Sequence, residues 1–250
     1  MTADAARAGH SVQPTGEIAS VGGLDAVGWS ASLWILHPMR ETDELPADIT
    51  WTEARRLHRT GRGRRRLGVV AEYLDWLALN ENARSLTQPP IGGWRRLTWR
   101  DLWRRSDVDP DQLEGYPSDG WFPSLGWPPS WPVNIDGPDE GSLDREQFLR
   151  LVEHLAAVSP RGRDEECFAY YAYLAAIEFE GDLLYGGCIG DLASLLESDD
   201  LDGTPSNIWP ADRSWLVYTD FDLWGTKVSG SAHLVARLVA DPELETMRLP

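Results

Sequence analysis

Several stretches of this chain place apolar residues at steps of three and four, which is the spacing of one face of a helix. Residues 67–79 carry one such stripe and residues 142–157 another. Thr50 with Glu53 forms a capping-box pattern before a helix that we expect to end near residue 61, and Thr98 opens a shorter helix. Segments 191–196 and 231–240 complete the predicted helices.

Other stretches are rich in β-branched and aromatic residues, which favour strands. The predicted strands are residues 29–36, 167–176, 213–219, 223–229 and 245–249. The turn Asp220-Phe221-Asp222 joins the third and fourth of these into a hairpin. Because helices and strands mix without a regular alternation, we predict an α+β fold. It would combine a mixed or antiparallel sheet with packed helices and a helical N-terminal portion.

The segment 107–141 has the wrong composition for a solvated linker, because it alternates tryptophans with prolines. We interpret it as an ordered connector that packs on a domain surface. The expected organisation is therefore a flexible arm over 1–22, a mostly helical basic region over 23–106, the Trp/Pro-rich connector over 107–141, and an acidic α+β unit over 142–250.

Charge is distributed unevenly along the chain. The net charge is −17, yet residues 51–105 carry 13 basic and 5 acidic side chains, and residues 106–250 carry 8 basic and 28 acidic ones. Such asymmetry is typical of a chain that attracts a charged partner, or whose own segments attract each other. We expect residues 51–105 to pack against the acidic C-terminal unit.

Composition limits the compartment and the cofactors. The N-terminal residues have no apolar stretch typical of a secretory signal, and no run of 18 apolar residues occurs. The chain has two cysteines, Cys167 and Cys188, too few for a disulfide framework. We therefore expect a cytoplasmic protein with reduced thiols, no membrane association and no cofactor.

Motifs for metal binding or catalysis are weak. The five histidines, His10, His37, His58, His154 and His233, lack the spacing of a helical zinc pair, and neither cysteine belongs to a C-x-x-C. Asp220 and Asp222 form a D-x-D pair, which we interpret as a turn because aspartate bonds to its own backbone. An enzyme whose active site converges from distant positions, such as Cys188 and His154, is the first alternative.

The Arg/Trp segment suggests a second alternative. The basic run His58–Arg66 and the Trp-Arg-Arg triplets beginning at Trp94 and Trp103 have the residue types that bind a phosphate backbone and stack on bases. The charge of the whole chain repels nucleic acid, so we expect no nucleic-acid partner.

The C-terminal fifty residues carry one resemblance. The motif Pro205-Ser206-Asn207-Ile208-Trp209-Pro210, followed by the hairpin 213–229 and a closing helix to Pro242, resembles small actinobacterial α+β proteins of the toxin-immunity type. That resemblance implies a non-catalytic inhibitor of a basic, toxin-like protein. Dense carboxylates would speed its encounter with such a partner, and aromatic anchors would slow release. The expected binding residues are Asp199, Asp200, Asp202, Trp209, Asp220, Asp222 and Trp224.

Overall fold

The fold is taken from a computed structural model of the chain, which describes residues 28–60, 67–80, 91–122, 131–172, 183–198, 201 and 203–248. The chain divides into two compact units. Unit 1 comprises residues 1–37, 114–119 and 139–250, and unit 2 comprises residues 38–113 and 120–138. Each unit is therefore assembled from segments that are distant in the sequence.

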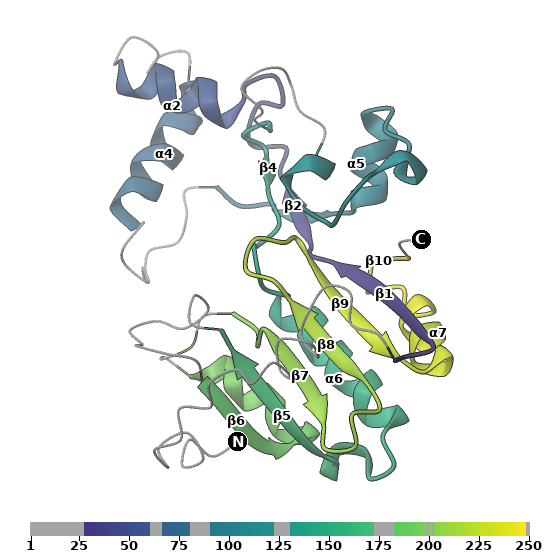
Figure 1. The fold of residues 1–250 in the computed structure, drawn as a ribbon. Helices are drawn as coiled ribbons and strands as arrows, with labels where there is room; N and C mark the ends of the chain where they lie inside the picture. The colour runs from purple at the N-terminus through teal and green to yellow at the C-terminus, as the bar shows by residue number, and fades with distance from the viewer. Residues whose placement is uncertain are drawn as a thin grey trace. The chain divides into compact units, whose positions relative to one another are not determined.

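Unit 1 is built on a seven-stranded antiparallel sheet with the strand order β10-β1-β9-β8-β7-β5-β6 (Figure 1). Its strands are β1 (Ala31–Leu36), β5 (Glu166–Tyr171), β6 (Leu183–Cys188), β7 (Asn207–Pro210), β8 (Leu216–Thr219), β9 (Gly225–Gly230) and β10 (Thr246–Met247). The predicted hairpin is confirmed, since Val217 of β8 pairs with Val228 of β9. Leu33 of β1 pairs with Val228 from the other side, which places β1 between β9 and the edge strand β10.

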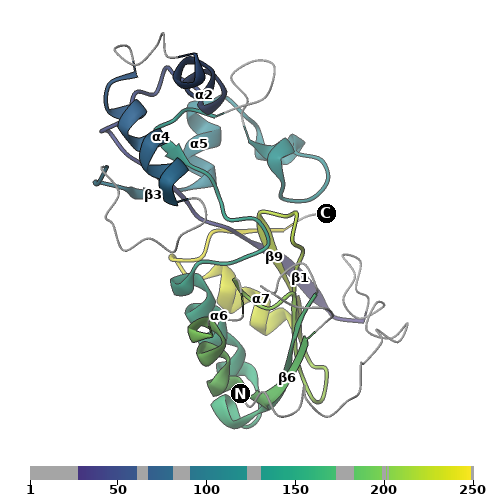
Figure 2. The same ribbon diagram turned by 90° about the vertical axis from the view of Figure 1, so that its left-hand side faces the viewer.

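One face of this sheet is covered by the helices α6 (Arg145–Val158) and α7 (Ala232–Val239), as the edge-on view of Figure 2 shows. The 3-10 segments η4 (Gly162–Asp164) and η6 (Ile189–Glu197) pack with α6. The side chains of Asp144 and Ser231 cap α6 and α7 by accepting hydrogen bonds from the third backbone N–H of each helix. The predicted stripe of α6 is fully buried in the core beneath the sheet.

Unit 2 combines helices with a small three-stranded sheet of order β3-β2-β4. Its helices are α2 (Trp51–Arg59), α4 (Val69–Asn80), α5 (Trp99–Arg105) and the 3-10 turn η2 (Pro110–Gln112). Its strands are β2 (Met39–Glu41), β3 (Arg95–Leu97) and β4 (Ile135–Asp136), and the 3-10 turn η3 (Asp119–Trp121) lies where the chain passes from unit 1 to unit 2. Thr50 and Thr98 cap α2 and α5 as predicted.

The α+β class is confirmed, but the division into regions differs from the one expected. β1 belongs to the C-terminal sheet and not to the basic region, which also contains the unexpected strands β2 and β3. The expected connector splits between the units: Pro117 packs in unit 1, whereas Trp121 and Phe122 are buried in unit 2. The expected arm 1–22 and residues 123–130 of the connector lie outside the described residues.

Candidate binding surface of unit 1

Only four of the seven predicted binding residues lie in the described part of the chain. Asp199, Asp200 and Asp202 lie outside the described residues. Trp209 lies on β7 and is half-buried, so it remains a candidate contact residue. The expectation of an exposed Trp224 is wrong, because this side chain is 2% exposed. Trp224 precedes β9, and its backbone N–H donates to the carbonyl of Pro117.

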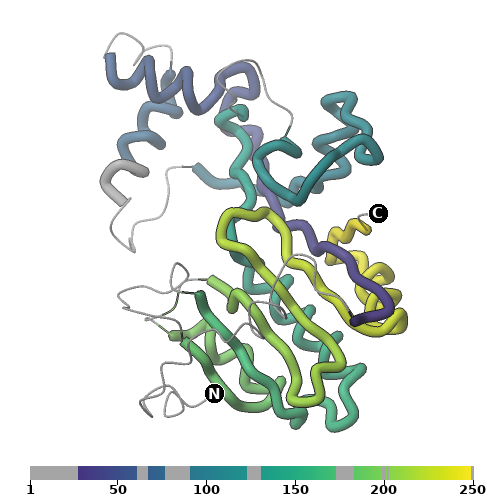
Figure 3. The backbone as a smooth tube through the Cα atoms, viewed as in Figure 1, coloured from purple at the N-terminus to yellow at the C-terminus, as the bar shows by residue number. Residues whose placement is uncertain are grey.

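The hairpin turn explains where the two other aspartates lie. Asp220 accepts hydrogen bonds from the N–H of Asp222 at 3.1 Å and from the hydroxyl of Tyr218 at 2.6 Å. The interpretation of Asp220 as a turn residue is therefore confirmed, and Asp222 is exposed beside it. Figure 3 follows the hairpin from β8 through this turn into β9. No group of three possible metal-ligating side chains occurs among the described residues.

The sheet face that α6 and α7 leave uncovered carries a group of aromatic side chains. Along β5, Cys167, Ala169 and Tyr171 point into the core, so Phe168 and Tyr170 point to the opposite face. The same alternation places Trp209 of β7 and Tyr218 of β8 on that face, and all four side chains are half-buried. We call Phe168, Tyr170, Trp209 and Tyr218 the aromatic face.

Phe168 and Trp209 form the best-defined pair of the aromatic face. They lie directly opposite each other on β5 and β7, with ring centroids 5.9 Å apart and an interplanar angle of 28°. On the other side of Phe168 stands Gly186 of β6, whose missing Cβ would lie 3.7 Å from the Phe168 ring. The ring therefore rests over a strip of backbone that carries no side chain.

Two exposed carboxylates, those of Glu166 and Asp191, lie near this end of the sheet. Glu166, one step before Phe168 on the same face, is exposed and has no ion-pair partner in the described part of the chain. Asp191 is exposed after β6, and its carboxylate accepts the N–H of Cys188 at 3.0 Å. Two neighbouring cations are already neutralised, because Arg161 pairs with Glu165 and Arg163 with Glu153. The surface around β5 and β6 is consequently negative.

Trp209 was predicted from the sequence as a contact residue, whereas Phe168, Tyr170 and Tyr218 were not. The burial of residues 166–171 alternates strictly in the structure, with Cys167, Ala169 and Tyr171 buried, although the sequence has apolar side chains at both alternating positions. Read at period two, this alternation places Phe168 and Tyr170 together on the opposite face.

The groups that a non-local active site would need do not come together among the described residues. Cys167 is fully buried, and this burial raises the pKa of its thiol to about 12, which keeps it protonated. The Nε2 atom of His154 lies 2.8 Å from the Asp241 carboxylate, and Arg150 reaches the same carboxylate at 3.2 Å. This arrangement joins α6 to the end of α7, and neither cysteine is a partner in it.

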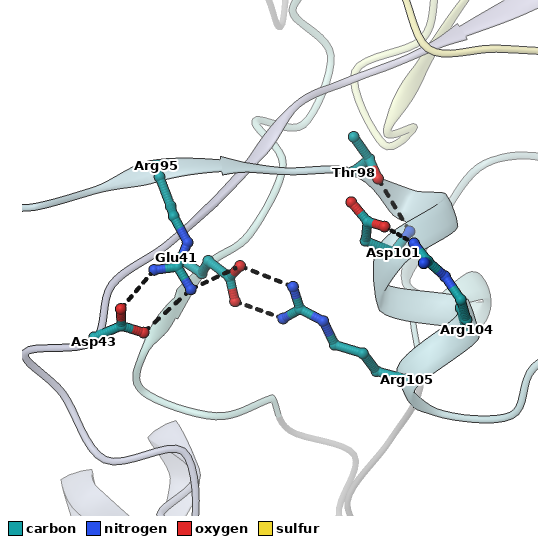
Figure 4. Close-up of polar contacts among 7 residues, drawn as sticks. All are labelled: Glu41, Asp43, Arg95, Thr98, Asp101, Arg104 and Arg105. Atoms are coloured by element: carbon teal, nitrogen blue, oxygen red, sulfur yellow. Dashed lines mark hydrogen bonds and ion pairs between the residues drawn. The ribbon is translucent and has the colours of Figure 1, made fainter.

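Three arginines of unit 2, Arg95, Arg104 and Arg105, form ion pairs within the unit, as Figure 4 shows. The buried carboxylate of Glu41 receives two bonds from Arg105, at 2.6 and 3.0 Å, and one from Arg95 at 3.2 Å. Arg95 also binds Asp43 at 2.8 Å, and Arg104 pairs with Asp101. The hydrogen bond from Arg105 and the two positive charges hold the pKa of Glu41 below its usual range, despite the opposing effect of burial.

These contacts remove one feature on which the nucleic-acid alternative depended, the triplet Trp103-Arg104-Arg105, whereas residues 61–66 of the basic run lie outside the described residues. Trp99 and Trp103 are buried and pack against each other at 5.5 Å, so they are not exposed platforms for stacking bases. Over its whole sequence unit 2 carries 14 basic and 13 acidic residues, whereas unit 1 carries 9 and 27. The basic segment is thus balanced inside its own unit, and the negative charge of the protein belongs to unit 1. Whether residues 51–105 pack against unit 1 stays a prediction.

Comparisons with known proteins identify no relative. No protein-family model matches the sequence, no curated protein matches it, and no solved structure matches the fold. None of the helices among the described residues is long and apolar enough to span a bilayer.

Proposed function

We propose that this protein is a non-catalytic binding protein of the immunity type, which acts in the cytoplasm and captures a basic partner protein on unit 1. The observation that carries the proposal is that the net charge of −18 in unit 1 accompanies a sheet face that no described helix covers and that carries half-buried aromatic side chains. A negative field speeds encounter with a cation, and aromatic side chains supply the contact area that holds a complex together.

The two contributions belong to different steps of binding. Glu166 and Asp191 are exposed, so their attraction acts before contact and is screened by salt over a Debye length of about 8 Å at physiological ionic strength. Phe168 and Trp209 are already ordered by stacking on each other, so little side-chain entropy is lost when a partner covers them. The carboxylates should therefore control the association rate, and the aromatic pair should control the dissociation rate.

Capture of the partner is the first test. The tagged protein should retain a basic protein from the lysate of its native host at low salt, and the identified partner should then be purified. A complex that forms at low salt and weakens as salt rises supports the proposal. If no basic protein is retained at any salt concentration, the proposed function is wrong.

Kinetics with the purified partner provide the second test. We expect Trp209→Ala to accelerate dissociation about 30-fold, because removal of an aromatic anchor costs about 2 kcal/mol. The matched control is Val239→Ala, since Val239 is 49% exposed on α7, which covers the opposite face. Equal dissociation rates for these two variants would contradict the aromatic face as the contact surface.

A further inference from the structure

Strand β6 forms one edge of the sheet of unit 1 and lacks the usual protection of an edge. Figure 1 shows β6 beside β5, and no described strand pairs with its outer side. Its six residues, Leu-Leu-Tyr-Gly-Gly-Cys, contain neither a charge nor a proline. Proteins normally blunt such edges with charged side chains, prolines or very short strands. The opposite edge follows that rule, because β10 has only two residues.

The hydrogen-bond register identifies which backbone groups face outward. The N–H of Ile189 donates to the carbonyl of Glu165 at 2.9 Å, one step beyond the paired strands β5 and β6. Because antiparallel pairs alternate between bonded and non-bonded positions, the N–H and C=O groups of Leu184 and Gly186 point away from β5. Neither residue has a hydrogen-bond partner for these groups within the described part of the chain. This outer row is a ready template for another strand.

Charge distinguishes between the possible occupants of this edge. A second copy of the chain would bring another unit of net charge −18 against the first, which opposes pairing. Glu166 lies opposite Cys188 on the adjacent strand, and Asp191 follows the end of β6; both are exposed. A segment with positive side chains would be attracted to the same position.

We propose that the outer edge of β6 is a strand-addition site, at which an extended, basic segment of the partner extends the sheet of unit 1. This inference rests on the proposed function and specifies where and how the partner binds. The main chain of the segment would bond to Leu184 and Gly186, which provides affinity without regard to sequence. Its cations would lie near Glu166 and Asp191, which provides selectivity.

Gly186 adds a side-chain preference to the site. Phe168 lies on the far side of Gly186 from the open edge, and its ring stands beside the position where a Cβ is missing. A large side chain on the added strand, opposite Gly186, can therefore lean across the glycine and contact the Phe168 ring. The edge of β6 and the aromatic face thus form one continuous surface.

A pair of substitutions at Gly186 separates main-chain recognition from side-chain effects. Gly186→Pro removes the outward N–H and places the proline ring on the open edge, while the ladder to β5 keeps its donors from neighbouring residues. Gly186→Ala keeps the N–H and adds a methyl group at ordinary contact distance from Phe168. Both variants should unfold at similar temperatures, which checks that the sheet is intact.

The probe is the peptide Ac-Arg-Thr-Val-Thr-Val-Thr-Arg-NH2, with its counterpart carrying glutamate at both ends as the control. Binding to the full-length protein is measured by fluorescence anisotropy, and exchange of the Leu184 and Gly186 amide protons by NMR. We expect the arginine peptide to protect both amides and to bind Gly186→Pro about tenfold more weakly than Gly186→Ala. The glutamate peptide should bind neither variant.

Several results would overturn the inference. Equal affinity of the two Gly186 variants for the arginine peptide, or unprotected amides in its complex, would place binding elsewhere. If the Leu184 and Gly186 amides are protected without peptide and this protection grows with protein concentration, a second copy of the chain occupies the edge. If they are protected in the monomer, another segment of this chain occupies it. None of these results affects the capture experiment or the kinetics of Trp209→Ala, which test the proposed function separately. Failure of the edge site is therefore distinguishable from failure of the proposed function.

Discussion

His37 gives unit 1 a calculable dependence on pH. The ring is fully buried at the end of β1, with Nδ1 2.7 Å from the carbonyl oxygen of Asp139 and Nε2 3.0 Å from the hydroxyl of Thr226. A carbonyl only accepts, so Nδ1 carries the proton and Nε2 accepts from Thr226. Burial lowers the pKa of His37 from its ordinary value of 6.5 to about 4, although the bond to Asp139 acts in the opposite direction.

The lowered pKa destabilises the folded protein in acid. Below pH 6.5 the unfolded chain takes up a proton at His37, but the folded chain does so only near pH 4. Stability is therefore lost as pH falls through this window. Between pH 6.5 and pH 5, which is about 1.5 pH units, the free energy of unfolding falls by about 1.4 kcal/mol per pH unit, or about 2 kcal/mol in total.

The test compares urea unfolding of wild type and His37→Asn at pH 7.5 and pH 5. Asparagine can donate to Asp139 from nearly the position of Nδ1 but does not titrate, so wild type should lose about 2 kcal/mol more than the variant. Thr226→Val is the control, because it removes the donor to Nε2 while the imidazole still titrates; it should be less stable at both pH values and keep the wild-type slope. Identical pH dependence in wild type and His37→Asn would refute the reasoning.

Three further predictions concern backbone strain and ion pairs. Gly141→Ala should lower the free energy of thermal unfolding by about 2 kcal/mol or more, because φ is +67° and a Cβ would lie 2.7 Å from the Phe221 backbone. Gly115→Ala, at φ +76° with no atom within 4 Å of the added Cβ, should lower it by only about 1 kcal/mol. Equal losses would contradict the close approach at Gly141. Glu41→Gln should destabilise unit 2 by about 2 kcal/mol in urea at neutral pH, and this loss should vanish in acid as wild-type Glu41 itself becomes protonated. Asp241→Asn should lower the melting temperature at pH 7. Burial raises the pKa of Asp241, but hydrogen bonds from His154 and the backbone of Glu243, together with the charge of Arg150, outweigh it and hold this pKa below its usual range. An unchanged melting temperature would show that these contacts do not stabilise the fold.

The features predicted correctly from the sequence depend on neighbouring residues. Thr50, Thr98 and Ser231 each begin a helix because their side chains bond to a backbone N–H three residues later, a contact that a local pattern fully specifies. The hairpin across Asp220 was predictable for the same reason, since its turn bonds within two residues.

The features that were missed depend on distant residues. Pairing of β1 with β9 joins Leu33 to Val228, and nothing in residues 31–36 indicates which part of the chain provides the partner. The small sheet β3-β2-β4 has strands of only two or three residues, too short for a period to be recognised. Trp224 was predicted as a binding residue but is buried, and its backbone N–H donates to Pro117, which is distant in the sequence.

The candidate surface could be found only in part. Trp209 was identified by residue type alone, and its partner Phe168 was missed because residues 167–171 carry apolar or aromatic side chains at every position. The stacked pair exists because β5 and β7 are neighbours in the sheet, although Phe168 and Trp209 lie 41 positions apart in the sequence. The open edge of β6 likewise depends on the strand order, which local patterns do not determine.

Association and dissociation rates of the captured partner, measured over a range of salt concentrations, test the central claim most directly. The claim predicts that Glu166→Gln slows association and weakens its salt dependence more than Glu146→Gln does, because Glu146 is exposed on α6, which covers the opposite face. It also predicts that Trp209→Ala mainly speeds dissociation. Association that is independent of salt, together with wild-type dissociation of Trp209→Ala, would contradict capture of a basic partner on the acidic, aromatic surface of unit 1.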